Sequence, residues 1–131
     1  MKKNRIPISL IIFALIIIFL ADSGNLPRVI RQLYDFPNGD KIGHFFLMGL
    51  LSYTLNQAAL STRNSSSNKK RNDRDLNLGR LIWTVSLSLA FFVTFEEISQ
   101  IYFPHRTFSL SDLAVNYLGI ALFAWIAWKR R

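Results

Sequence analysis

The 131-residue sequence contains no cysteine and is poor in acidic residues, with 8 Asp and Glu against 16 Lys and Arg. Without cysteine, the chain cannot form disulfides, use a thiolate nucleophile or bind zinc through sulfur. Charged residues are missing from the apolar blocks 6–21, 81–95 and 113–128, and the block 42–60 contains one His. Half of the residues are hydrophobic and are gathered in these blocks, which argues against a soluble core.

Each apolar block is long enough to form a transmembrane helix. An α-helix rises about 1.5 Å per residue, so roughly 16 to 20 residues cover most or all of a hydrocarbon core about 30 Å thick. The blocks lack the alternation of a membrane β-strand, and lipid cannot satisfy open backbone groups. We therefore predict one all-α domain with transmembrane helices at about 6–21, 42–60, 81–103 and 112–128.

The net charge of +8 is explained by where the basic residues fall along the chain. Twelve of the 16 precede the first block, lie between the second and third blocks, or end the chain, and these are the same side of a four-pass protein. The positive-inside rule therefore places both termini and the middle loop in the cytoplasm. Because the basic segments lack interleaved aromatic residues, we expect membrane lipids, and no nucleic acid, as partners.

The segment 61–79 is the one low-complexity stretch of the chain. It is rich in Ser, Asn, Lys and Arg and has too few apolar residues to fold alone. We predict that it forms a flexible cytoplasmic linker between the second and third transmembrane helices, where its charges can touch anionic lipid.

The chain before the second apolar block has a weak helical pattern. Four apolar residues between 22 and 39 approximate helical spacing: Leu26, Ile30, Leu33 and Phe36. Either a short helix on the membrane surface or an ordinary packed loop satisfies this pattern. The first block itself is either an uncleaved helix or a signal peptide, and Asp22 within the candidate cleavage site favours the helix.

Polar side chains gather at one end of the predicted bundle, where the second and fourth helices begin and the third helix ends. They include the adjacent carboxylates of Glu96 and Glu97, which must face protein or water because lipid disfavours an unpaired charge. The cytoplasmic ends carry no comparable set, so we expect a water-accessible pocket on the outer face. The cluster comprises Asp40, Lys41, His44, Glu97, Gln100, Arg106, Asp112 and Asn116, with Glu96 and His105 as weaker members.

Several of these residues also have an ordinary structural explanation. Asp40 suits the N-cap of the second helix. Ser109 or Ser111 is placed to cap the fourth helix, with Asp112 in or near its first turn. Asn116, inside the membrane, can bridge two helices by hydrogen bonding.

The polar residues fall in four short motifs: D-K-I-G-H-F at 40–45, E-I-S-Q at 97–100, P-H-R at 104–106 and S-x-x-D-L-x-x-N-x-x-G at 109–119. In these motifs the sequence resembles the VanZ-like family of bacterial membrane proteins. The first helix fits in topology only, and His105 stands where a glycine is expected before the arginine. The resemblance implies a multi-pass protein of the bacterial inner membrane, related to one associated with low-level teicoplanin resistance. It implies no reaction.

Two functions remain open from the sequence. In the first, the outer-face site binds or modifies an envelope ligand that is lipid-linked or carries phosphate, with a role in glycopeptide resistance. Arg106 and Lys41 could hold the phosphate, while Glu97 and His44 exchange protons. In the alternative, the protein is a non-catalytic scaffold or interaction protein, and the polar cluster is structural.

Other activities are less favoured by the sequence. Ion or proton transport would need a polar path, and none continues into the cytoplasmic half of the predicted helices. A metal site built from His44, His105 and carboxylates lacks a recognised ligand motif. We expect no cofactor, and the sequence leaves the oligomeric state and any enzyme activity open.

Overall fold

The computed structural model describes residues 5–22, 25, 27–34, 37–64, 71–104 and 107–130, and all regular structure in these ranges is helical. The elements in chain order are α1 (Arg5–Asp22), α2 (Arg28–Tyr34), α3 (Gly39–Asn64), α4 (Arg71–Ser99), the 3₁₀ turn η1 (Gln100–Tyr102) and α5 (Leu110–Lys129). The prediction of an all-α fold is confirmed.

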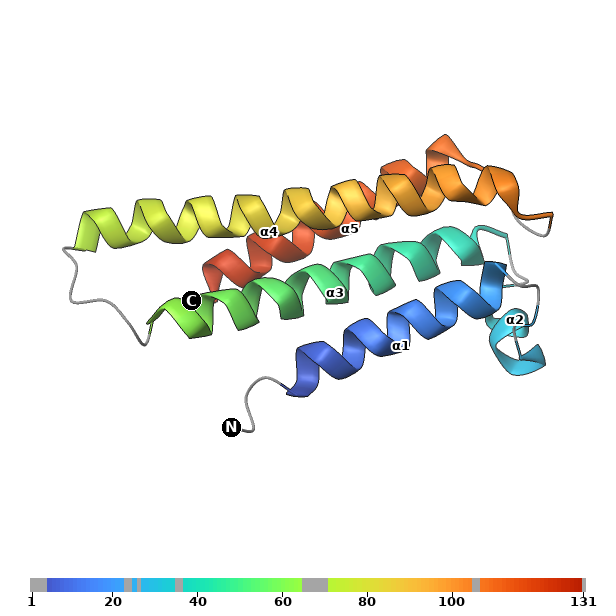
Figure 1. Ribbon diagram of the computed structural model, residues 1–131, viewed down its shortest axis with the longest axis horizontal. Helices are drawn as coiled ribbons and strands as arrows, with labels where there is room; N and C mark the ends of the chain where they lie inside the picture. Colours follow the sequence, from blue (N-terminus) through green and yellow to red (C-terminus); the bar gives the residue numbers. More distant parts are fainter. Residues whose placement is uncertain are drawn as a thin grey trace.

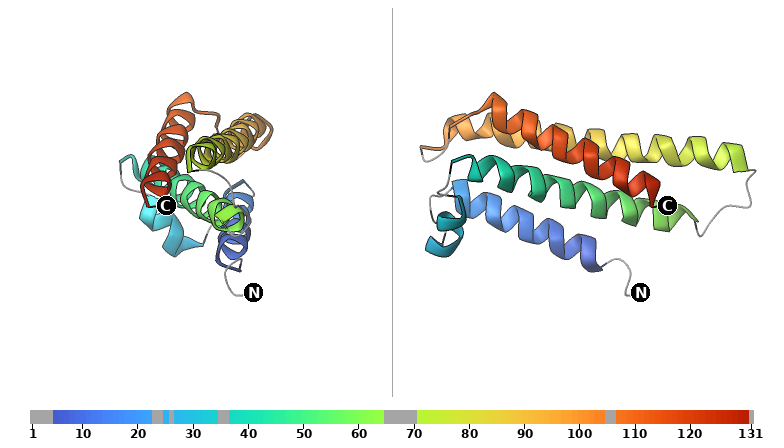
Figure 2. Two further views of the ribbon diagram at one scale, coloured as in Figure 1. Left: turned by 90° about the vertical axis from the view of Figure 1, so that its left-hand side faces the viewer. Right: turned by 180° about the vertical axis from the view of Figure 1, so that it is seen from behind.

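The four long helices lie alongside one another and run in alternating directions (Figures 1 and 2). α1 runs toward the end of the bundle where α2 lies, α3 returns, α4 runs toward α2 again, and α5 returns. The last turns of α1 and α4 and the first turns of α3 and α5 therefore share one end, which we call the α2 end. The opposite end, where α5 finishes, is called the C-terminal end.

The most extensive helix contact joins α3 and α5, which run parallel to each other. A Cβ atom added at Gly119 would overlap the carbonyl oxygen of Phe45 and lie 3.3 Å from the backbone nitrogen of Gly49. The Ser52 hydroxyl donates a hydrogen bond to the Ile120 carbonyl at 3.0 Å. Glycine at 119 therefore permits backbone-to-backbone packing, as small residues do between helices in lipid.

Buried apolar side chains form two small clusters, while many large ones lie on the outside. One cluster contains Ala14, Met48, Leu51, Leu89, Val93 and Ile120, and the other contains Leu60, Leu78, Ile82 and Ala124. On the outside, Phe91 is 76% exposed and Phe95 is 68% exposed. Such an apolar exterior is rare on a soluble protein and is suited to lipid.

Two segments of the described chain are long and apolar enough to cross a membrane, Leu76–Tyr102 and Leu110–Lys129. Each segment contains an apolar stretch of 18 residues, and 22% of this stretch is buried inside the bundle in the first segment and 28% in the second. The core helix of a soluble protein would be mostly buried. The exposure of these two helices therefore argues that they are not core helices of a soluble protein.

The structure differs from the predicted flexible linker over 61–79. α3 continues to Asn64 and α4 begins at Arg71, so helix covers both flanks of that segment. Leu78 is buried beside Leu60 and Ile82, which anchors this part of α4 in the core. Once a helix is nucleated, each further residue adds a hydrogen bond at small cost, so a segment poor in apolar residues can still continue a helix.

The chain between α1 and α3 contains a short helix, α2, which was one of the two alternatives for this segment. α3 then begins at Gly39, one residue before the predicted N-cap Asp40. Asn38 has a left-handed φ of 65° and its carbonyl accepts the Ile42 N–H at 3.1 Å, which starts the helix earlier. The capping prediction is therefore wrong, and Asp40 lies in the first turn, where its charge suits the helix N-terminus.

Candidate functional site

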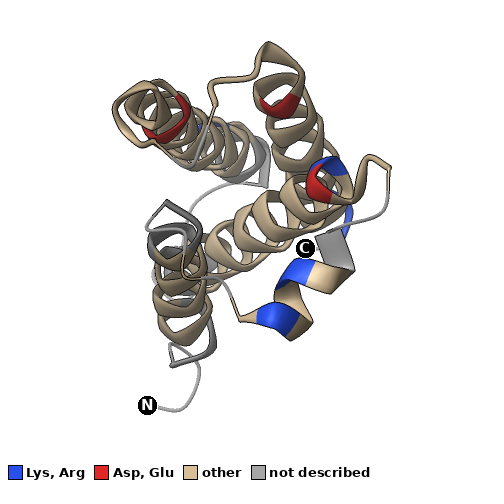
Figure 3. Cartoon of the chain, turned by 90° about the vertical axis from the view of Figure 1, so that its right-hand side faces the viewer, with Lys and Arg blue, Asp and Glu red and all other residues tan. Residues whose placement is uncertain are grey.

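An ion-paired group lies at the α2 end, at the beginnings of α3 and α5 (Figure 3). The Lys41 ammonium is 3.3 Å from an oxygen of Asp112 and 3.6 Å from an oxygen of Asp40. The Lys41 side chain is 32% exposed, so the pair is accessible from outside the bundle. We call Asp40, Lys41 and Asp112 the lysine group.

Asp112 is held in place by the local structure at the start of α5. Ser109 is the N-cap, and its hydroxyl accepts the Asp112 N–H at 3.4 Å and contacts the Ser111 hydroxyl at 2.7 Å. The Ser109 alternative for the cap is thus confirmed, with Asp112 in the first turn as predicted. A carboxylate there is stabilised by the positive end of the helix.

The charge state of Lys41 follows from its neighbours. A hydrogen bond to Asp112 and the charge of that carboxylate raise the pKa of Lys41 above its ordinary value of 10.5, with Asp40 adding to the effect. Because the folded pKa is raised, titration of Lys41 leaves any stability from this pairing intact below pH 10.5 and removes it only at more alkaline pH. Lys41 is therefore a permanent cation at physiological pH.

A buried carboxylate group lies at the end of α4. The Gln100 amide nitrogen donates to Glu96 at 2.8 Å and to Glu97 at 3.3 Å. The other Glu97 oxygen accepts the Ser109 N–H at 2.9 Å. Glu97 and Gln100 are almost completely buried and Glu96 is 7% exposed. We call Glu96, Glu97 and Gln100 the glutamate group.

Ser109 connects the two groups. Its N–H donates to Glu97 of α4, and its hydroxyl accepts from the backbone of Asp112 in α5. The glutamate group therefore fixes the start of α5, and with it the carboxylate that holds Lys41. The sequence predicted Ser109 as one of two candidate helix caps. It did not predict the bond to Glu97, because that bond depends on how the connection from α4 to α5 folds back.

Asn116 is fully buried on α5, one turn beyond Asp112. Among the described residues, neither polar atom of its side chain has a hydrogen-bond partner, so the predicted bridge between helices is wrong. Since Lys41 pairs with Asp112 and Gly119 packs against Phe45, Asn116 lies between these two contacts along the α3–α5 interface. The site thus has a buried amide beneath its exposed ion pair.

Polar contacts continue from the site toward the C-terminal end. The Asn56 amide donates to the Ser52 carbonyl at 2.9 Å and to the Ser86 hydroxyl at 3.3 Å, and Gln57 donates to the Ala127 carbonyl at 3.3 Å. This row was not predicted, and it shows that polar residues are not confined to the α2 end of the bundle. The spacing of Ser52 and Asn56, four residues apart in an apolar block, was the available signal. In lipid such bonds hold helices together.

The comparison with known families supplies the identity. The family model described as VanZ/LLP1 matches residues 1–130, nearly the whole chain. The chain belongs to the VanZ/LLP1 family. No curated protein and no solved structure matches it. Together with its two long apolar helices, VanZ/LLP1 membership indicates a membrane protein and confirms the resemblance carried by the sequence motifs.

The fold of this VanZ/LLP1 protein brings most of the predicted site residues to one end. The lysine group and the glutamate group are joined through Ser109, and His44 lies half-buried one turn after Lys41. His105 and Arg106 lie outside the described residues. Within the described part of the chain, no three His, Asp or Glu side chains are grouped closely enough to hold a metal ion.

Proposed function

We propose that this VanZ/LLP1 protein crosses the bacterial inner membrane four times, with both termini and the connection between α3 and α4 in the cytoplasm. Three observations support this topology: the four apolar blocks, the alternating directions of the four long helices, and the 12 basic residues that would share the cytoplasmic side. The α2 end then faces the outside of the cell.

In this orientation the lysine group belongs to an outer-face site that binds a phosphate-bearing, lipid-linked ligand of the cell envelope. The observation that carries this proposal is a protonated and accessible Lys41 held between two carboxylates. A phosphate can replace one of these carboxylates as the partner of the ammonium. Arg106, the only strong cation in the turn before α5, is assigned the same role from the sequence.

The site is better suited to binding than to proton transfer at Glu97. That side chain is fully buried, and each carboxylate oxygen already accepts a hydrogen bond, one from Ser109 and one from Gln100. A general base must come within hydrogen-bond reach of the proton that it removes. We therefore assign Glu97 a positioning role and Lys41 the contact with the ligand. The relationship to a teicoplanin resistance protein supports an envelope ligand, and glycopeptide resistance is the phenotype we propose to follow.

A purely structural function is the second candidate. The bond from the Ser109 backbone to Glu97 ties the end of α4 to the start of α5. A protein whose polar cluster only braces the helices would need this tie and would not depend on an accessible cation. The two candidates therefore differ in what they require of Lys41.

Replacing Lys41 by Gln separates the two functions. We expect K41Q to keep its abundance and to lose little in melting temperature, because the Lys41 side chain is partly exposed and the amide of Gln can still donate a hydrogen bond to the Asp112 carboxylate. We also expect it to lose any teicoplanin resistance that the wild-type protein gives to a strain lacking its own VanZ/LLP1 proteins. The measurements are the teicoplanin minimum inhibitory concentration and the melting temperature of the purified protein.

The matched control is Arg28→Gln, which removes an exposed cation from α2 at the same end of the bundle. It should retain resistance. If wild-type protein gives resistance and K41Q gives as much, Lys41 does not contact the ligand and the structural function is favoured.

A further inference from the structure

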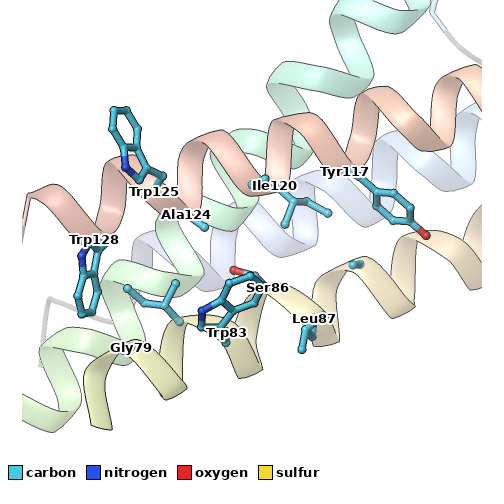
Figure 4. A pocket seen from close by; sticks show the side chains of 12 residues that line it. Gly79, Trp83, Ser86, Leu87, Tyr117, Ile120, Ala124, Trp125 and Trp128 are labelled. Atoms are coloured by element: carbon cyan, nitrogen blue, oxygen red, sulfur yellow. The ribbon is translucent and has the colours of Figure 1, made fainter. Parts of the chain in front are cut away.

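An apolar groove of about 650 Å³ lies between α4 and α5 (Figure 4). It is lined by Gly79, Ile82, Trp83, Ser86, Leu87 and Ala90 of α4 and by Tyr117, Ile120, Ala121, Ala124, Trp125 and Trp128 of α5. The two hydroxyls in this lining are already bonded, Ser86 to Asn56 and Tyr117 to Thr94. The groove therefore offers an almost wholly apolar surface.

The lining of the groove suits an apolar occupant. Both a lipid acyl chain and an apolar helix of a second copy match side chains of this kind. The charges beside the groove favour the lipid, because an anionic phospholipid places a phosphate at the end of its acyl chains.

Cations flank the groove at the C-terminal end. A Cβ atom added at Gly79 would lie 3.6 Å from the Trp128 ring, so α4 and α5 are in contact there. The next residues along the chain, Arg80 and Lys129, are both exposed, and the Lys129 ammonium lies 4.3 Å from the centre of the Trp125 ring. Every charged residue within 76–83 and 125–130 is basic.

We propose that the groove binds one anionic phospholipid, with an acyl chain between α4 and α5 and the phosphate beside Arg80 and Lys129. Basic pockets between membrane helices on the cytoplasmic side are suited to anionic headgroups, and tryptophan is favoured at the membrane interface. This site is distinct from the outer-face site, because the lysine group lies at the other end of the bundle.

The chain contains a built-in reporter of this groove. Its only three tryptophans, Trp83, Trp125 and Trp128, all line the groove. The full-length protein in detergent is titrated with phosphatidylglycerol or phosphatidylcholine, each brominated on its acyl chains, and tryptophan quenching is recorded. We expect half-maximal quenching at a phosphatidylglycerol concentration at least fivefold lower than for phosphatidylcholine. Unlabelled phosphatidylglycerol should reverse the quenching.

Two variants test the two parts of the proposed site. Ala121→Phe fills the groove and should weaken quenching by both lipids, whereas Leu122→Phe, on an exposed neighbour outside the lining, should not. Arg80→Gln should reduce the preference for phosphatidylglycerol by about fivefold, because a cation near an anionic membrane surface contributes about 1 kcal/mol. The control Arg28→Gln, at the α2 end, should leave the preference unchanged.

Equal quenching by the two lipids, or quenching that A121F and R80Q leave unaltered, would overturn the proposal. Crosslinking through the groove into a dimer that phospholipid does not displace would also overturn it and would identify a second copy as the occupant. Because none of these readouts uses teicoplanin or Lys41, failure here leaves the outer-face site untouched.

Discussion

At the scale of single residues, Glu97 is the side chain on which the arrangement of the site depends most. Its carboxylate accepts from the Ser109 backbone and from the Gln100 amide while being fully buried. Glu96, its neighbour, also accepts a hydrogen bond from this amide, and no backbone N–H is described as donating to its side chain. The two carboxylates are adjacent in sequence, but only Glu97 is described as accepting a backbone N–H, that of Ser109.

This difference predicts unequal effects of alanine substitution. E97A leaves the Ser109 N–H without its acceptor and removes one of the two acceptors of Gln100, which should cost about 2–4 kcal/mol of stability, since an unpaired buried group costs about 1–3 kcal/mol. Among the described contacts, E96A leaves Gln100 still bonded to Glu97 and leaves no backbone donor without its acceptor, so E96A should cost less stability than E97A. The check is thermal unfolding of both variants in the same detergent. A smaller loss for E97A than for E96A would contradict the assigned contacts.

Asn116 and Asn56 form a second informative pair. Both are fully buried, but Asn56 donates to Ser52 and Ser86, whereas the Asn116 side chain has no partner among the described residues. Replacing a buried polar group that has no partner by an apolar one of similar shape removes its desolvation penalty. We expect N116L to match or exceed the melting temperature of the wild type.

In contrast, N56L should lower the stability by about 0.6 kcal/mol and by at most about 1.7 kcal/mol, the average and the maximum found for hydrogen bonds between membrane helices. Both variants are measured by thermal unfolding of the purified protein. A clear loss of stability in N116L would show that Asn116 has a polar partner in the folded protein, such as a bound water, and would correct the description of this residue.

At the scale of secondary-structure elements, the α3–α5 contact is the tightest part of the bundle. It predicts that Gly119→Ala is destabilising, because the added methyl group overlaps the backbone of Phe45 and forces the helices apart. Overpacking of this kind costs about 1–3 kcal/mol or more. Thermal unfolding tests the prediction.

Gly79→Ala is the matched control for this substitution. Its nearest neighbour would be the Trp128 ring at 3.6 Å, an ordinary contact, and alanine favours helix over glycine by up to about 1 kcal/mol. G79A should therefore be neutral or stabilising. If G119A were as stable as G79A, the close packing of α3 and α5 would be wrong.

The elements that the sequence predicted are those governed by local pattern. Uninterrupted apolar blocks predicted helices, and local spacing predicted a cap at Ser109 or Ser111 with Asp112 in or near the first turn, of which Ser109 is the observed cap. The bond between Glu97 and Ser109 and the approach of Gly119 to Phe45 depend on how distant segments meet. Contacts between distant segments leave no periodic pattern in the sequence. The sequence therefore predicted which residues lie at one end of the bundle and did not predict which of them touch.

Two errors of the sequence analysis have the same origin. The segment 61–79 was predicted to be a flexible linker from its composition alone, yet residues 71–79 continue a helix that Leu78 anchors in the core. Asn116 was expected to bridge helices because a buried amide usually finds a partner. In both cases the observed structure depends on tertiary packing, which cannot be inferred from composition alone.

At the scale of the whole molecule, the account rests on which end of the bundle faces outward. The lysine group and the phospholipid groove lie toward opposite ends, so a reversed orientation would exchange the two compartments that they meet. The absence of cysteine is an advantage here, since any single cysteine that is introduced is the only thiol in the protein. Thr107 near the start of α5 and Arg130 after its end are both exposed and mark the two ends.

The most direct test is therefore the labelling of Thr107→Cys and Arg130→Cys in intact spheroplasts with a membrane-impermeant maleimide. We predict that T107C is labelled at once and that R130C is labelled only after the membrane is permeabilised. Denatured protein, in which both must react, serves as the control. Labelling of R130C but not T107C in intact spheroplasts would place the polar site in the cytoplasm and contradict an outer-face site.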